Sequence, residues 1–196
     1  MANGFQLVNI SSTRKCKDLS QYPIKTTASF GGVVRNTLIL CGGITSNVDE
    51  HGDSVLTSDC YVHDPLIDSW KFLARLKTVK YYPGIVVLDD RIWITGGMLS
   101  PDVVQDSTEY LFSSGRVESG PTLPYISWGH CMVRLMDGRV MILGGGNDDG
   151  SHSNALRVIV YDSEKKKFTF DYPRLRRVEF FARAPCFKAL HVIIDL

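Results

Sequence analysis

The stretch Gly138–Gly146, Gly-Arg-Val-Met-Ile-Leu-Gly-Gly-Gly, decides how this chain folds. Its central apolar residues are bounded by glycines and are too few to form the face of a helix, so they predict a short buried β-strand. The closing glycines have no Cβ. They can therefore adopt positive φ and let a neighbouring backbone approach closely.

The same pattern occurs at two earlier places in the chain. Thr37–Cys41 precedes one diglycine, and Arg91–Thr95 precedes another. From Gly42 to Gly96 is 54 residues, and from Gly96 to Gly144 is 48. An internal period near 50 residues is typical of propellers and solenoids. The three diglycines are Gly42, Gly43, Gly96, Gly97, Gly144 and Gly145.

A second spacing supports this period. Pairs of residues seven apart flank a polar turn in each unit, which predicts a hairpin with one member on each arm. These pairs are His63 and Trp70, Tyr110 and Val117, and Tyr161 and Phe168. Each unit then has four strands, which in the middle unit we expect at Gly84–Leu88, Arg91–Thr95, about Ser107–Leu111 and about Arg116–Ser119.

With the string His63-Asp64-Pro65-Leu66-Ile67-Asp68-Ser69-Trp70, these features make the chain resemble the kelch-repeat family. The family prefers Tyr where His63 stands, and Trp where Val117 and Phe168 stand. The resemblance implies an all-β fold, a β-propeller of four-stranded antiparallel blades forming one domain over residues 1–196. The expected segments are a half blade at about 5–20, blades at about 28–76, 82–120 and 128–172, and a half blade at about 180–196.

The two half blades leave two possibilities for the ring. No diglycine follows the apolar segment Ala189–Ile194, so we expect the chain to be a piece of a larger propeller. Alternatively, the half blades pair with each other and close a ring of four blades.

Composition excludes some classes of partner. The chain has 22 basic and 21 acidic residues and a net charge of +1, which predicts no electrostatic attraction to nucleic acid or to a membrane surface. Five cysteines without a CxxC motif leave two interpretations open: buried thiols, or one or two disulfides in an oxidising compartment. We therefore expect a cytoplasmic protein by default, and an extracellular one if the cysteines are paired.

The sequence offers no catalytic or metal-binding motif. Its five histidines form no HxH or HExxH pair, and no phosphate-binding glycine loop precedes a helix pattern. Copper radical oxidases are relatives within the family, but no stretch here matches their ligand arrangement. We therefore expect no enzyme activity, no catalytic residue, no cofactor and no metal.

Function is then expected in the loops that a rigid propeller presents. Loops follow the three diglycines at residues 44–57, 98–106 and 147–154, and connectors between blades add aromatic and basic residues. The candidate partner-binding residues are Asp49, Glu50, His51, Asp53, Lys80, Tyr81, Asp102, Tyr125, Trp128, Asp148, Asp149 and His152.

The expected function is a protein-binding module whose partner is a protein or peptide. The resemblance implies two partner classes: components of a cullin-RING ubiquitin ligase, with this chain as the recognition part of an adaptor, or actin. The alternatives are a secreted, disulfide-supported kelch protein and a copper-radical-oxidase-like enzyme.

Overall fold

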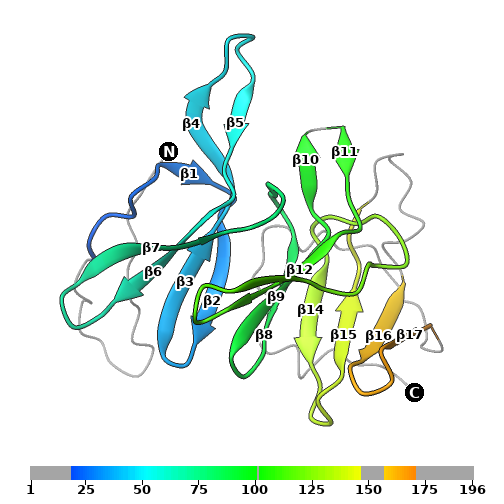
Figure 1. Ribbon diagram of the computed structural model, residues 1–196. Coiled ribbons are helices and arrows are strands. Elements are labelled where there is room, and N and C mark those ends of the chain that lie inside the picture. The colour runs from blue at the N-terminus through cyan, green and yellow to red at the C-terminus, as the bar shows by residue number, and fades with distance from the viewer. Residues whose placement is uncertain (1–18, 101, 147–156, 171–196) are drawn as a thin grey trace, which may run out of the picture.

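The computed structural model describes residues 19–100, 102–146 and 157–170, and these residues form β-strands and connecting turns (Figure 1). Twelve of the strands make three four-stranded antiparallel sheets, each a meander in chain order. The first sheet is β2 (Phe30–Val34), β3 (Thr37–Cys41), β6 (Asp59–Asp64) and β7 (Ser69–Arg75). The second is β8 (Gly84–Val87), β9 (Arg91–Thr95), β12 (Thr108–Phe112) and β13 (Val117–Ser119). The third is β14 (Cys131–Arg134), β15 (Val140–Leu143), β16 (Val158–Asp162) and β17 (Lys167–Thr169).

The sheets follow one another with their first strands innermost. β2 contacts β8, and β8 contacts β14, while β7, β13 and β17 are the last strands of their sheets (Figure 1). Four-stranded sheets arranged in this way are the blades of a propeller. The predicted half blades, 180–196 and all but the last two residues of 5–20, lie outside the described residues.

Each diglycine lies directly after the second strand of its sheet, in the same left-handed conformation. The φ angles are 62° and 98° at Gly42 and Gly43, and 57° and 94° at Gly96 and Gly97. A Cβ on Gly96 would lie 2.2 Å from the carbonyl oxygen of Ser127, in the connector to the next sheet. The pattern therefore exists because a strand end and a connector must approach more closely than a side chain permits. Gly144 and Gly145 repeat the geometry, with φ of 71° and 96°.

The middle sheet is buried on both of its faces. Ile92 and Ile94 of β9 pack against the first sheet, whereas Trp93 between them packs against the third. This follows from the two-residue period of a strand, which sends successive side chains to opposite faces. An almost wholly apolar strand is what such a position requires.

The hairpins between the third and fourth strands show that one of the three predicted residue pairs is wrong. His63 lies opposite Trp70 and Tyr161 opposite Phe168, with ring centroids 5.0 and 4.8 Å apart. In the second sheet, however, Val117 lies opposite Leu111. The turn there has three residues between Phe112 and Arg116, one fewer than the turns of the other two sheets.

That shorter turn moves the register by one residue. Tyr110 therefore faces Glu118 instead of Val117, although the spacing of seven in the sequence is the same. Tyr110 packs instead beside Trp93, with ring centroids 5.7 Å apart, on the face toward the third sheet.

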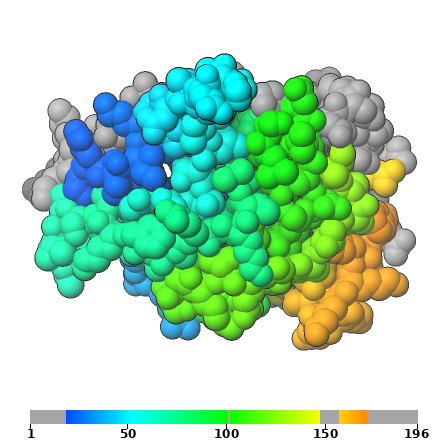
Figure 2. All heavy atoms as spheres, turned by 45° about the horizontal axis from the view of Figure 1, so that its top comes forward, coloured from blue at the N-terminus to red at the C-terminus, as the bar shows by residue number. Residues whose placement is uncertain are grey.

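Two segments predicted as long loops fold into β-hairpins. β4 (Ile44–Val48) pairs with β5 (Ser54–Leu56), and the short strand β1 (Thr26–Thr27) pairs with β4. β10 (Met98–Ser100) pairs with β11 (Val103–Val104). Both hairpins project from the same side of the sheets, and Figure 2 turns this side toward the viewer.

Candidate functional site

The β4–β5 and β10–β11 hairpins occupy equivalent places in the first two sheets. β4 begins directly after Gly43, and β10 begins directly after Gly97. The bridge between Tyr81 and Met98 holds the base of the second hairpin, and the pairing of Thr26 with Thr45 holds the base of the first. The frame therefore fixes where both hairpins leave the sheets.

The tip of the β4–β5 hairpin is an acidic turn that is ordered by its own backbone. Asp49 Oδ1 accepts hydrogen bonds from the backbone N–H groups of His51 and Asp53, each at 2.9 Å. Glu50 and His51 form an ion pair at 3.5 Å, and all four side chains of the predicted set here are exposed. An Asx-type turn of this kind presents carboxylates to a partner without ordering the loop anew.

Aliphatic side chains accompany the acidic ones on both hairpins. Val48 is 64% exposed and Val55 37%, and on the β10–β11 hairpin Val103 is 46% and Leu99 36% exposed. Asp102, which the sequence also singled out, is exposed in the turn of the second hairpin. Sequence reasoning missed the aliphatic residues because residues 46–48, Ser-Asn-Val, and 54–56, Ser-Val-Leu, do not alternate between apolar and polar side chains.

Lys80 and Tyr81 were predicted to contact a partner, and the structure contradicts this for both. Lys80 is fully buried, and its Nζ lies 3.3 Å from Glu109 Oε1 and 3.0 Å from Ser107 Oγ. Burial lowers the pKa of Lys80, and the nearby carboxylate of Glu109 opposes that shift. Tyr81 is 6% exposed because its backbone bridges to Met98.

Glu109 fastens the connector that carries Lys80. Its carboxylate accepts hydrogen bonds from the backbone N–H groups of Lys77, at 2.6 Å, and Thr78, at 3.2 Å, and from the Thr78 hydroxyl at 2.7 Å. A buried charge with this many donors is satisfied, and removal of the carboxylate would leave Lys80 as an uncompensated buried cation. The cluster is therefore structural, and it could not be predicted from the sequence because its members lie far apart along the chain.

Tyr125 and Trp128 lie in the connector between the second and third sheets. Trp128 forms a backbone bridge with Gly146, and a Cβ on Gly146 would lie 2.8 Å from the indole ring. Tyr125 is half-buried, and burial raises the pKa of its hydroxyl to about 12. Both aromatic rings pack between structural elements, which limits what they can offer to a partner. Asp148, Asp149 and His152 lie outside the described residues.

His130 is buried at the junction of the second and third sheets. Its Nε2 shares a hydrogen bond with Thr95 Oγ1 at 2.6 Å, and Thr95 Oγ1 also lies 3.3 Å from Gly84 O and 3.0 Å from Met132 Sδ. Its Nδ1 has no hydrogen-bond partner among the described residues. Burial lowers the pKa of His130 to about 4, so the ring is neutral near pH 7.

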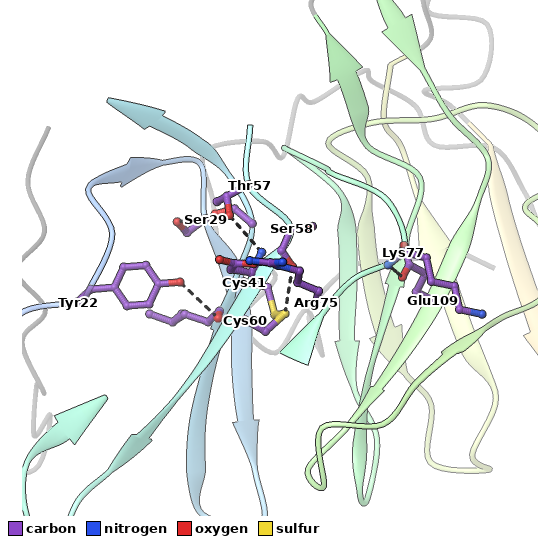
Figure 3. Close-up of a disulfide and its surroundings, with 12 residues drawn as sticks. Tyr22, Ser29, Cys41, Thr57, Ser58, Cys60, Arg75, Lys77 and Glu109 are labelled. Carbon is purple, nitrogen blue, oxygen red and sulfur yellow. Dashed lines mark hydrogen bonds and ion pairs between the residues drawn. A yellow bond between two sulfur atoms is a disulfide. The ribbon is translucent and has the colours of Figure 1, made fainter. Parts of the chain in front are cut away.

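A disulfide joins Cys41 at the end of β3 to Cys60 near the start of β6 (Figure 3). The two residues lie directly opposite each other, with Cα atoms 4.1 Å apart, as in the narrow pairs of an antiparallel ladder. Of the two interpretations that the sequence left open for these cysteines, this is the disulfide. The sequence left the pairing open because the two residues are 19 positions apart and their register depends on the fold.

The described residues were also compared with the requirements of a metal site and of a membrane-spanning helix. Within residues 19–100, 102–146 and 157–170, no group of three or more His, Cys, Asp or Glu side chains is placed to hold a metal ion. No helix among these residues is long and apolar enough to cross a membrane.

Comparison with known proteins gives relatives of one kind. No family model matches the chain. Kelch repeat and BTB domain-containing protein 1 of vaccinia virus (strain Copenhagen) is 28% identical over 155 residues, which are 74% of this chain and 26% of the relative. Beta-scruin of Limulus polyphemus is 27% identical over 143 residues, 69% of this chain and 15% of the relative. The solved structure of YjhT, a kelch propeller protein, superposes with a TM-score of 0.66 at 11% identity, covering 85% of this chain and 60% of that chain.

The chain is therefore similar to kelch-repeat proteins over about three quarters of its length. Its kelch module spans about a quarter of the length of the poxvirus relatives it matches. The likeness to YjhT concerns the fold alone, and it supports the assignment of the three sheets described above as blades of a β-propeller. What the kelch module binds has to be argued from its own surface.

Proposed function

We propose that this kelch module is a non-catalytic protein-binding module that holds its partner with the β4–β5 and β10–β11 hairpins. The observation that carries the proposal is the paired projection of two hairpins with exposed aliphatic side chains (Figure 2). Val48, Leu99 and Val103 offer apolar area, which is the main source of affinity in protein interfaces.

The charge of the hairpins specifies the kind of partner. Residues 44–57 and 98–106 contain five carboxylates, of Asp49, Glu50, Asp53, Asp102 and Asp106, and neither segment contains Lys or Arg. We therefore infer a partner surface with an apolar centre and a basic rim, since complementary charge speeds association and excludes wrong partners. The interaction is expected to weaken as salt increases, because the tip carboxylates are exposed.

The finer alternatives are the recognition part of a ubiquitin-ligase adaptor and an actin-binding protein. In the first case the hairpins would contact a ligase substrate, and in the second they would contact actin. Co-sedimentation with filamentous actin distinguishes the two. Sedimentation that is lost in Val103→Ser and kept in Leu66→Ser would support actin as the partner. No sedimentation would leave a ligase substrate as the proposed partner.

The test of the proposal itself uses site-specific photo-cross-linking. A photoreactive residue at Val48 or Val103 should cross-link a partner, and the same residue at Leu66 or Met136 should not. Leu66 and Met136 are matched controls because both side chains are fully or nearly fully exposed and lie in turns at the other end of the strands. Equal cross-linking at all four positions would contradict the proposal.

The disulfide supports a second candidate, an extracellular kelch protein. Disulfides persist in oxidising compartments, and Cys41–Cys60 is buried within the first sheet. Expression of the chain behind a secretion signal should give protein in which alkylation in denaturant without reductant leaves Cys41 and Cys60 unmodified. Modification of both cysteines in that material would contradict the extracellular candidate.

A further inference from the structure

A cavity of about 170 Å³ opens between the second and third sheets, at the end of the strands away from the two hairpins. Its walls come from the turn between β8 and β9, the strands β9 and β12, and the strands β15 and β16. An apolar cavity of about 150 Å³ is large enough for benzene. The apolar part of the wall consists of Leu88, Trp93, Tyr110, Val140 and Tyr161, of which Leu88 and Tyr110 are only partly buried.

One cation in this cavity, Arg91, forms no ion pair among the described residues, although its charge helps to lower the pKa of nearby Asp89. Arg91 lines the wall, its Nε is buried, and this atom has no hydrogen-bond partner among the described residues. The guanidinium carbon lies 4.7 Å from the centre of the Tyr110 ring and 5.2 Å from that of Phe112. Aromatic faces stabilise the charge, but they do not accept the N–H groups in the guanidinium plane.

The second arginine of the cavity differs in this respect. Arg134 forms a bidentate ion pair with Asp89 across the two sheets, with Nη2 3.0 Å from Oδ2. Its charge is therefore neutralised, and the pKa of Asp89 is lowered by the hydrogen bond from Arg134. Asp90 also lines the cavity and, like Asp89, would repel an anion, which limits affinity.

We propose that this cavity binds a compact carboxylate with a flat or apolar body, its carboxylate on Arg91 and its body against Leu88 and Tyr110, the less buried apolar side chains of the wall. The planar guanidinium fork matches a carboxylate in two parallel hydrogen bonds, and a partly buried site strengthens both. The volume limits the ligand to about the size of benzoate or of a glutamate side chain. The site is at the opposite end of the strands from the hairpins, so it stands independently of the proposed function.

The test is an NMR titration of the full chain at pH 7, with the indole N–H of Trp93 as the reporter and that of Trp70 as the internal reference. Benzoate should shift the Trp93 signal with saturation, and benzamide, its neutral isostere, should bind at least tenfold more weakly. Equal binding of benzamide, or no shift with benzoate, would overturn the proposal. This comparison needs no variant and so does not depend on whether one folds.

Variants assign the effect to a residue. Arg91→Gln should weaken benzoate binding at least tenfold, whereas Arg116→Gln should leave it unchanged. Arg116 is the matched control because it also stacks on Phe112, at 3.9 Å, but does not line the cavity. Asp90→Asn should tighten binding, since it removes a like charge. An unchanged affinity in Arg91→Gln would overturn the assignment.

A blocked glutamate, N-acetyl-glutamate amide, distinguishes two sources of the carboxylate. If it binds with the same dependence on Arg91, an acidic side chain of a partner is supported as the occupant. If benzoate alone binds, a free small acid is supported.

Discussion

The two junctions between neighbouring blades are built from different chemistry. Between the first and second sheets, aliphatic side chains such as Val34, Ile39, Ile94 and Leu111 meet at full burial, around the Cys41–Cys60 disulfide. Between the second and third sheets, Trp93 and Tyr161 pack with ring centroids 5.0 Å apart, near a buried histidine and an open cavity. The same blade geometry is thus filled once by close aliphatic packing and once by large rings that leave space.

The difference follows from the alternation along β9. Its even-numbered side chains, Ile92 and Ile94, enter the first junction, and its odd-numbered ones, Arg91, Trp93 and Thr95, enter the second. On this one strand, the even-numbered side chains therefore serve the closed core, and the odd-numbered ones face the junction that contains the cavity. The first junction is expected to respond to mutation as a closed core, and the second to tolerate added volume and to respond to pH.

The largest effect is expected at the connector of the first junction. Glu109→Gln removes the charge that faces buried Lys80 and should lower the free energy of unfolding by about 3–5 kcal/mol. Glu118→Gln is the control, because its pair with Arg116 is exposed and should contribute at most about 1 kcal/mol. Urea unfolding measures both. A loss below about 1 kcal/mol in Glu109→Gln would show that the contacts of Glu109 with the connector do not stabilise the junction.

Removal of the disulfide should come next. The double substitution Cys41→Ala with Cys60→Ala should lower the free energy of unfolding by about 3 kcal/mol, because the bond closes a loop of 19 residues in the unfolded chain. Wild-type protein unfolded with and without reductant is the matched comparison. Equal unfolding midpoints with and without reductant would be evidence against the bond.

His130 should make the second junction sensitive to pH. Its pKa in the folded state is about 4, against about 6.5 when unfolded, so the unfolded chain binds more protons between these values. Stability should therefore fall by about 2 kcal/mol as the pH is lowered from 7 to 5. Thermal unfolding across this range measures the slope, and His130→Gln should flatten it. An equal slope in wild type and variant would assign the pH dependence to other groups.

The smallest effect is expected when a methylene group is added to a side chain in each of the two junctions. Val34→Ile adds a methylene to the closed first junction and should destabilise by about 1 kcal/mol. Val140→Ile adds the same group beside the cavity and should change stability by less than about 0.5 kcal/mol in either direction. Denaturant midpoints measured in parallel decide this, and equal losses would remove the contrast between the junctions.

The sequence predicted the repeating strands because their signals are local. Apolar runs that end in diglycines gave β3, β9 and β15, with Arg91–Thr95 predicted to the residue. The register of the second hairpin was wrong because spacing alone does not reveal a turn shortened by one residue. Lys80 was misplaced because its partner Glu109 comes from a strand 29 positions later, and only the folded sheets bring the two together.

The acidic turn residues of the candidate site could be predicted from the sequence, but the β-hairpins that carry them could not. Asp49, Glu50, Asp53 and Asp102 were identified as polar residues between strands, and they lie at the exposed turns of the two hairpins. Their segments were expected to be loops, since short runs with few apolar residues are weak strand signals. The cavity beside Arg91 had no sequence signal, because its walls come from two sheets.

Hydrogen–deuterium exchange of the chain alone and with its captured partner shows whether the two hairpins hold that partner. We expect slower exchange on binding in Ile44–Val48, Ser54–Leu56 and Met98–Ser100, with no change in the turns around Leu66 and Met136. Protection confined to those turns, with the two hairpins exchanging as before, would contradict it.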